Sequence, residues 1–286
     1  MLNAAARRHL GTDPVMAALI AAAGRCALEP QPGTPPFQYL VRAIVHQQLN
    51  GTAAGRILER LVALYAPAAF PSPAGLLATP DGPLRGAGLS AGKIRALRDL
   101  AAHVQSGVVP ADCAELAALE DAAIVERLTA VRGVGRWTVE MLLIFQLGRR
   151  DVLSVDDFGV RNGFRLAYGL ARMPRARALA AFGARWAPHR TLATWYLWRA
   201  VDLAKAGKLP APPRQRPRVE MEKPRPAARN GGAARPSPKR ASPKRATPKR
   251  RTAKRVTPKR AAPKRAAPQR RSPRRAAQSG RGRARV

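Results

Sequence analysis

Two glycines separate apolar stretches in the segment LTAVRGVGRWTVEML, residues 128–142. Glycine tolerates positive φ and lets backbone N–H groups come close to a ligand. A helix is expected to begin directly after them, and the N-terminus of a helix favours anions. The segment therefore predicts a phosphate-binding hairpin formed by Gly133, Val134, Gly135 and Arg136. Val134 is expected to point inward and lock the turn.

Two adjacent carboxylates, Asp156 and Asp157, follow in the segment DVLSVDDFGVRNGF, residues 151–164. Only one of the pair can face a given cleft. If Asp157 is the active residue, Val160 and Phe164 share one side of the next helix at i+3 and i+7. This phasing favours Asp157 over Asp156, although a lone aspartate at a helix start is often only an N-cap. We assign that capping role to Asp156.

The elements that must position these residues are all expected to be helices. Apolar residues recur at helical spacing with no alternating, strand-like stretches, so the body is predicted to be all-α. The expected helices are Val15–Ala27, Phe37–Leu49, Ala53–Tyr65, Lys93–Val104, Ala122–Val131, Thr138–Leu147, Val160–Leu170 and Leu192–Leu203. Breaks are expected at Pro30–Pro36, Pro67–Pro73, Pro80–Gly88, Gly107–Pro110 and Gly133–Gly135.

The charge of the chain points to a polyanionic partner. The 286 residues carry a net charge of +35. Residues 211–286 hold 27 basic and 2 acidic residues and no aromatic one. Prolines recur there every five residues within SPKR-like units, which predicts a disordered basic tail over residues 210–286 after a helical domain over residues 1–209. Such a tail should bind nucleic-acid phosphates without reading sequence, and RNA stays open beside DNA.

Five segments, in order, resemble the helix-hairpin-helix glycosylase superfamily (HhH-GPD), most closely DNA-3-methyladenine glycosylase II. They are FQYLVRAIVHQQLNGTAAGRIL, LRGAGLSAGKIRALRDLA, VRGVGRWTVEMLLIF, LSVDDFGVRNGF and RWAPHRTLATWYLWR, and they span about residues 37–200. The resemblance implies two helical subdomains around a cleft. It also implies base excision repair of alkylated bases such as 3-methyladenine and 7-methylguanine, with Asp157 as the essential carboxylate.

The resemblance also implies the mechanism. The damaged base is flipped out of the duplex before its glycosidic bond is cut. An alkylated purine is already cationic and leaves without an acid, so one carboxylate suffices to stabilise the sugar cation or orient water. Bifunctional members carry a Schiff-base lysine where this chain has Trp137, so a monofunctional hydrolase that leaves an abasic site is expected.

Aromatic faces are expected to hold the flipped base. Trp198 matches the family position that stacks on the base, and Trp137 lies close by the same argument. Met141 stands where relatives often carry an aromatic residue, which puts the substrate range in doubt but not the reaction. Trp186 and Trp195 are expected in the core.

The resemblance implies that the gap left by the flipped base is filled from the loop after the first long apolar helix, which here is the segment His46–Asn50. Gln48 or Leu49 is the candidate intercalating plug, and His46 is a candidate reader of a base edge. The alternative is that this stretch is a helix end with Leu49 in the core.

The remaining expectations concern cofactors, location and rival functions. We expect a monomer that acts on double-stranded DNA in the cytoplasm at the nucleoid, or in the nucleus, with no membrane segment and no metal or cofactor in its chemistry. A monovalent cation at the hairpin is the one ion that the resemblance allows. The alternatives are a glycosylase for oxidised or deaminated bases, disfavoured by the missing lysine and by only two cysteines, and a nonenzymatic DNA-compacting protein.

Overall fold

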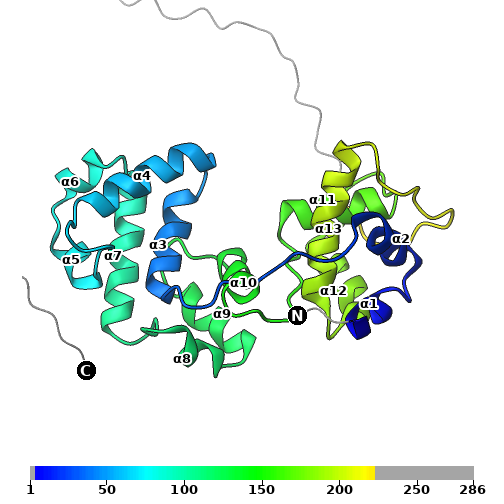
Figure 1. The fold of residues 1–286 in the computed structure, drawn as a ribbon, viewed down its shortest axis with the longest axis horizontal. Coiled ribbons are helices and arrows are strands. Elements are labelled where there is room, and N and C mark those ends of the chain that lie inside the picture. Colours follow the sequence, from blue (N-terminus) through cyan, green and yellow to red (C-terminus); the bar gives the residue numbers. More distant parts are fainter. Residues whose placement is uncertain (1–3, 223–286) are drawn as a thin grey trace, which may run out of the picture. The chain divides into compact units, whose positions relative to one another are not determined.

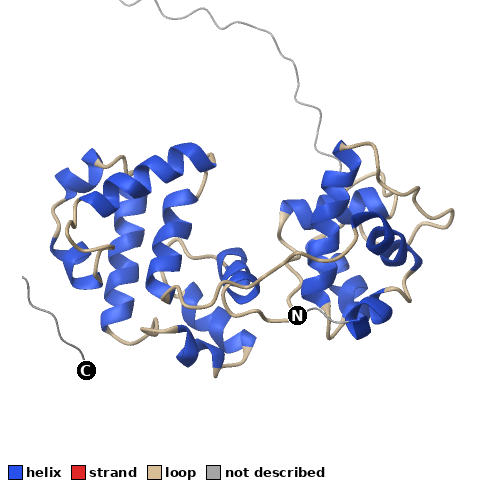
Figure 2. Ribbon diagram, in the orientation of Figure 1, coloured by secondary structure: helices blue, strands red, loops and turns tan. Residues whose placement is uncertain are grey.

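The computed structural model describes residues 4–222, and these residues are helical as predicted (Figures 1 and 2). They form thirteen α-helices, one 3-10 turn and no strand beyond a single bridge between Pro174 and Met221. None of the described helices is long and apolar enough to cross a bilayer. The five-residue repeats of the predicted tail lie outside the described residues.

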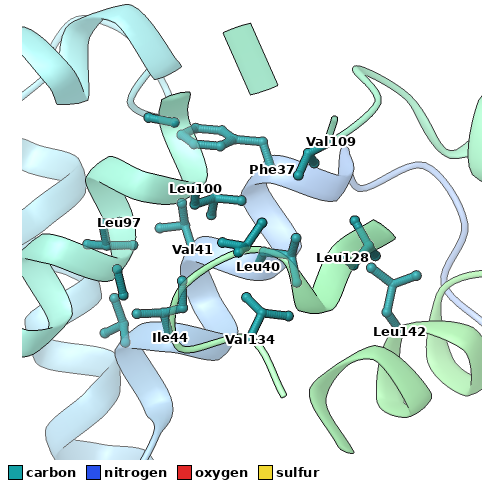
Figure 3. Packing of buried hydrophobic residues seen from close by; sticks show 14 of the residues in the cluster. Phe37, Leu40, Val41, Ile44, Leu97, Leu100, Val109, Leu128, Val134 and Leu142 are labelled. Carbon is teal, nitrogen blue, oxygen red and sulfur yellow. The ribbon is translucent and has the colours of Figure 1, made fainter. Parts of the chain in front are cut away.

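Helices α3 to α10 surround the first of two apolar cores. Their bounds are α3 Pro36–His46, α4 Gly51–Ala63, α5 Pro73–Ala78, α6 Asp81–Gly86, α7 Ala91–Gln105, α8 Cys113–Ala117, α9 Asp121–Thr129 and α10 Arg136–Phe145. In α3 the buried residues Phe37, Leu40, Val41 and Ile44 follow helical spacing and form one apolar stripe. Figure 3 shows this stripe beside buried residues of α7, α9 and the hairpin.

The second core gathers both ends of the described chain. Its helices are α1 Ala4–Leu10, α2 Pro14–Ala23, α11 Phe158–Ala167, α12 Ala176–Gly183 and α13 Arg190–Lys205, with the 3-10 turn η1 Ala184–Trp186. Phe164 stacks on Tyr168 with ring centroids 4.3 Å apart. Trp186 is fully buried, as expected, and Trp195 is partly buried against the same core.

Side-chain caps explain where several helices begin. A side-chain oxygen of the residue before the helix (carboxylate, amide or hydroxyl) accepts a hydrogen bond from a backbone N–H of its first turn. These caps are Asp13 for α2, Asn50 for α4, Ser72 for α5, Ser90 for α7 and Asp112 for α8. Proline at the first helical position also starts α2, α3 and α5.

The segment after α13 differs from the predicted tail, which was expected to begin at residue 210. Residues 210–222 are described, and their end pairs with the loop before α12. Arg175 N donates to Glu220 O at 2.8 Å, and Glu222 N donates to Met173 O at 2.9 Å. Arg161, Arg175 and Arg177 form ion pairs with Glu220 and Glu222. The two acidic residues of the basic region therefore attach its first part to the helical body.

Candidate active site

Asp157 is the N-cap of α11, and this corrects the expectation that Asp156 has that role. The Asp157 Oδ1 atom accepts a hydrogen bond from Val160 N at 2.7 Å. Asp156 is exposed and caps nothing. Asp157, the residue that the phasing argument favoured, is also the less exposed of the pair, so the cap and the candidate catalytic group are the same carboxylate.

Two indole groups converge on the same carboxylate. Trp137 Nε1 donates to Asp157 Oδ2 at 2.8 Å, and Trp198 Nε1 donates to Asp157 Oδ1 at 2.9 Å. With Val160 N, three N–H donors from three helices face one acidic group, and hydrogen bonds to an ionised acceptor are strong ones. The structure thus brings together Asp157, Trp137 and Trp198, which lie up to 61 positions apart in the sequence.

Two glycines in α11 allow this close approach. A Cβ atom at Gly159 would lie 3.0 Å from both Asp157 Oδ1 and Trp198 Cδ1. A Cβ atom at Gly163 would lie 1.9 Å from the carbonyl oxygen of Leu197 in α13. The spacing of four in FGVRNGF places both glycines on the face of α11 that meets α13. That spacing was a readable signal that sequence reasoning did not use.

The predicted phosphate hairpin has the expected local geometry. Gly133 has φ +79°, Gly135 is the N-cap of α10, and Val134 is buried in the first core (Figure 3). The N–H groups of the first turn of α10 have no partner within the helix, which makes this turn suited to an anion. Arg136 stands there with an exposed side chain whose Nε donates to Glu140 Oε1 at 2.8 Å.

A cavity of about 850 Å³ lies between α3 and α10. Four of the predicted residues line it, namely His46, Gln48, Trp137 and Met141, whereas Trp198, Leu49 and Asp157 do not. Trp137 is therefore the residue that connects the cavity wall to the carboxylate.

Sequence reasoning missed several cavity residues, notably Phe145, Tyr39 and Arg42. Phe145 lies nearly parallel to Trp198 with ring centroids 5.9 Å apart, so this wall residue connects the cavity to the Trp198 indole. Burial raises the pKa of Tyr39 to about 12, so its hydroxyl keeps its proton at neutral pH. The helical spacing of Trp137, Met141 and Phe145, four residues apart on α10, could have identified Phe145.

The expected plug residues lie in the loop between α3 and α4. The helix ends at His46, three residues before the predicted end, and Leu49 is 41% exposed, so the alternative of a core Leu49 is wrong. Among described non-glycine residues only Gln48 has a positive φ, at 59°. A non-glycine residue in this region is strained by about 1–2 kcal/mol, and such strain is often found at functional sites. Gln47 Nε2 ties the loop to the hairpin through Gly133 O at 2.8 Å.

Comparisons with known proteins agree with this geometry. The family described as HhH-GPD superfamily base excision DNA repair protein matches residues 41–189. The chain is 39% identical over 169 residues to DNA-3-methyladenine glycosylase 1 of Schizosaccharomyces pombe, covering 59% of this chain and 74% of the relative.

Two solved structures have the same fold at appreciable identity. One is the S. pombe 3-methyladenine DNA glycosylase Mag1 in complex with abasic DNA, with 36% identity, a TM-score of 0.62, and coverage of 70% of this chain and 97% of that one. The other is a DNA-3-methyladenine glycosidase from Bacillus halodurans, with 39% identity, a TM-score of 0.62, and coverage of 69% and 89%.

Proposed function

Since the chain belongs to the HhH-GPD superfamily of base excision DNA repair proteins, we propose that it hydrolyses the N-glycosidic bond of alkylated bases in DNA. Its relatives are named as 3-methyladenine glycosylases, and one was solved with abasic DNA, the product of such a reaction. The observation that carries the proposal is the Asp157 carboxylate, held by two indoles and a helix N-terminus beside a cavity large enough for a flipped base.

The hydrogen bonds at Asp157 indicate which oxygen acts. A carboxylate offers about four lone-pair positions, two on each oxygen. Oδ1 accepts from Val160 N and Trp198 Nε1, whereas Oδ2 accepts from Trp137 Nε1 alone among the described residues. Oδ2 therefore keeps an acceptor position beside the tryptophan that lines the cavity. We assign to Oδ2 the stabilisation of the sugar cation or the orientation of the attacking water.

The proposed reaction needs no acid. The bond between C1′ and the base nitrogen breaks, the electron pair leaves with the cationic base, and the base departs neutral. The positive charge passes to the sugar, near the Asp157 carboxylate. Water then adds to C1′ and loses a proton, which leaves an abasic site. Trp137 stands where a Schiff-base amine would be needed, so strand cleavage is not part of the proposal.

The surrounding residues have proposed binding roles. The flipped base lies against Trp137 and Met141, with the Trp198–Phe145 pair behind them, and Gln48 or Leu49 fills the gap in the duplex. Gly133, Val134, Gly135 and Arg136 hold a backbone phosphate. A monovalent cation would suit the carbonyl oxygens of that turn, where Gly133 O already accepts one hydrogen bond from Gln47. No step is assigned to a metal or cofactor.

The basic region gives the proposed enzyme a second attachment to DNA. Residues 211–286 carry 27 basic and 2 acidic residues, and both acidic ones pair with arginines of the body. We propose that the remaining positive charge binds DNA phosphates without sequence preference and keeps a monomer on DNA, at the nucleoid or in a nucleus.

Base release from methylated duplex DNA tests the function. The intact chain and Asp156→Asn should release 3-methyladenine or 7-methylguanine, whereas Asp157→Asn should bind the duplex and release neither. The strands should stay whole until alkali is added. Release that survives in Asp157→Asn would transfer the role to Asp156. If the intact chain releases nothing from alkylated, oxidised or deaminated DNA, the chain is a nonenzymatic DNA-binding protein.

A further inference from the structure

Glu140 is a buried acid that the proposed reaction does not use. It lies in α10, one turn after Trp137, and is 3% exposed. Burial raises the pKa of its carboxyl above the ordinary value. A buried carboxylate is strongly unfavourable unless it is paired and hydrogen-bonded. The Glu140 carboxylate has such hydrogen bonds from two partners, one to each oxygen.

The two partners belong to different parts of the site. Arg136 Nε donates to Glu140 Oε1 at 2.8 Å, from the hairpin end of α10. Ser154 Oγ donates to Glu140 Oε2 at 2.7 Å, from the loop that leads to α11. Ser154 is fully buried, and its carbonyl oxygen accepts from Asp157 N at 3.2 Å. A continuous series of contacts therefore connects the helix of Trp137 to the backbone of Asp157.

Within residues 4–222, the bond from Ser154 to Glu140 is the only side-chain hydrogen bond between α10 and the part of this loop that precedes Asp157. Thr191 and Thr194 of α13 bind the loop at Val152 instead. Asp157 also meets α10 directly, through the 2.8 Å bond from Trp137 Nε1 to Oδ2. Glu140 therefore joins the loop before Asp157 to the same helix that carries the Trp137 indole.

We propose that Glu140 is a positioning residue, which holds the Ser154–Asp157 loop against α10 so that Trp137 and Asp157 stay in contact. The inference deepens the proposed function and rests on it for its kinetic consequence. A displacement of about 1 Å at a reacting group can lower a rate by about 10²-fold. Arg136, held by the other Glu140 oxygen, stays at the phosphate hairpin by the same means.

Three variants of the full chain separate this role from general packing. Glu140→Ala removes both contacts, and Ser154→Ala removes only the contact to the loop. Glu140→Gln keeps an acceptor for Ser154 and removes the charge that holds Arg136. Glu126→Ala is the matched control, because Glu126 is an exposed acid on neighbouring α9.

The first readout needs no activity. The four tryptophans give four indole N–H signals in a ¹⁵N–¹H spectrum, assigned with single Trp→Phe variants. Glu140→Ala and Ser154→Ala should move the signals of Trp137 and Trp198, which bind Asp157. The signals of Trp186 and Trp195 serve as internal controls. Glu140→Gln and Glu126→Ala should leave the Trp137 and Trp198 signals in place.

The second readout is the single-turnover rate of base release, measured with thermal unfolding. Glu140→Ala and Ser154→Ala should each lose about 10²-fold in rate, and the double variant little more, because both variants remove the same contact between Ser154 and Glu140. Glu140→Gln should keep most of the rate. If Glu140→Ala does not fold, Ser154→Ala carries the test.

Three results would overturn the proposal: unchanged Trp137 and Trp198 signals in Glu140→Ala or Ser154→Ala, a full rate in both variants, or losses that simply add in the double variant. If the intact chain releases no base, the proposed function fails while the indole spectra still decide whether Glu140 holds the loop.

Discussion

Replacing Gly163 by alanine tests the packing on which the site depends. Gly163 lies in the middle of α11, against α13. An added Cβ would stand 1.9 Å from the Leu197 carbonyl oxygen and 2.7 Å from its carbonyl carbon, whereas real Cβ contacts are essentially never under 3.0 Å. Because these atoms are backbone, no side-chain rotation relieves the clash, and the two helices must move apart by more than about 1 Å.

The expected loss of stability follows from two opposed terms. Alanine in place of glycine inside a helix is normally favourable by about 1 kcal/mol. Overpacking of a tight contact is unfavourable by about 1–3 kcal/mol, and a backbone clash lies at the upper end. We expect Gly163→Ala to lower the free energy of unfolding by about 2 kcal/mol. For a domain of this size that corresponds to a Tm lower by about 4–8 °C.

Gly55→Ala provides the matched control for this experiment. Gly55 also lies inside a helix, α4, but a Cβ there meets nothing within 4 Å. Thermal unfolding should show Gly55→Ala equal to or more stable than the intact chain, and Gly163→Ala less stable. Base release should also fall in Gly163→Ala, because separating α11 from α13 stretches the bond from Trp198 to Asp157. A raised Tm for Gly163→Ala would refute the reasoning.

Four further results are expected. Trp137→Phe keeps a ring in the cavity wall but removes a hydrogen bond to Asp157, and hydrogen bonds to charged groups are worth about 1.5–3 kcal/mol. Single-turnover release should therefore fall by about 10- to 150-fold, and an unchanged rate contradicts the role of the indole. Gln48→Ala should weaken binding to duplexes with an abasic site more than binding to intact duplexes in fluorescence anisotropy, and equal losses would remove Gln48 as the plug. Burial pushes the pKa of Asp151 up, but hydrogen bonds from Arg190 outweigh it and lower the pKa. The ion pair with Arg190 therefore stabilises the fold above the ordinary aspartate pKa, and this stabilisation is lost as the pH falls through the lowered pKa. Asp151→Asn should lower Tm at pH 7, and the Tm difference from the intact chain should disappear in acid. A Tm difference that persists in acid contradicts this sign. Truncation after Glu222 should flatten the salt dependence of DNA binding and spare turnover on short duplexes, whereas equal salt slopes would contradict tethering by the basic region.

Much of the fold could be predicted from apolar spacing. All eight predicted helices are present, with ends shifted by a few residues. The short helices α1, α5, α6, α8 and α12 were missed, and α6, Asp81–Gly86, lies inside a predicted break. A helix of five to eight residues covers at most about two turns, so its periodicity cannot be told from chance.

The site could be predicted where a local pattern fixes geometry, and not where distant packing does. The Gly133–Gly135 turn follows from residue type alone. The family resemblance placed Asp157, Trp137 and Trp198 in one site, with the two tryptophans as base-stacking residues. The hydrogen bonds from both indoles to Asp157 were not predicted, because no sequence rule gives the direction of side chains that distant packing brings together. The pairing of Glu220 and Glu222 with three arginines was not predicted, since a proline-rich charged segment carries no periodicity to indicate its partners.

The double role of Asp157, as helix cap and as proposed catalyst, has a consequence for inheritance. Asparagine caps a helix about as well as aspartate, so Asp157→Asn should remove the negative charge while α11 still begins at the same residue. That replacement needs only one nucleotide change in an aspartate codon. A gene lineage can therefore pass in one step from an enzyme to a folded, DNA-binding protein without chemistry. Selection at this codon then acts on the repair activity itself, because the replacement would change the amount of folded protein very little.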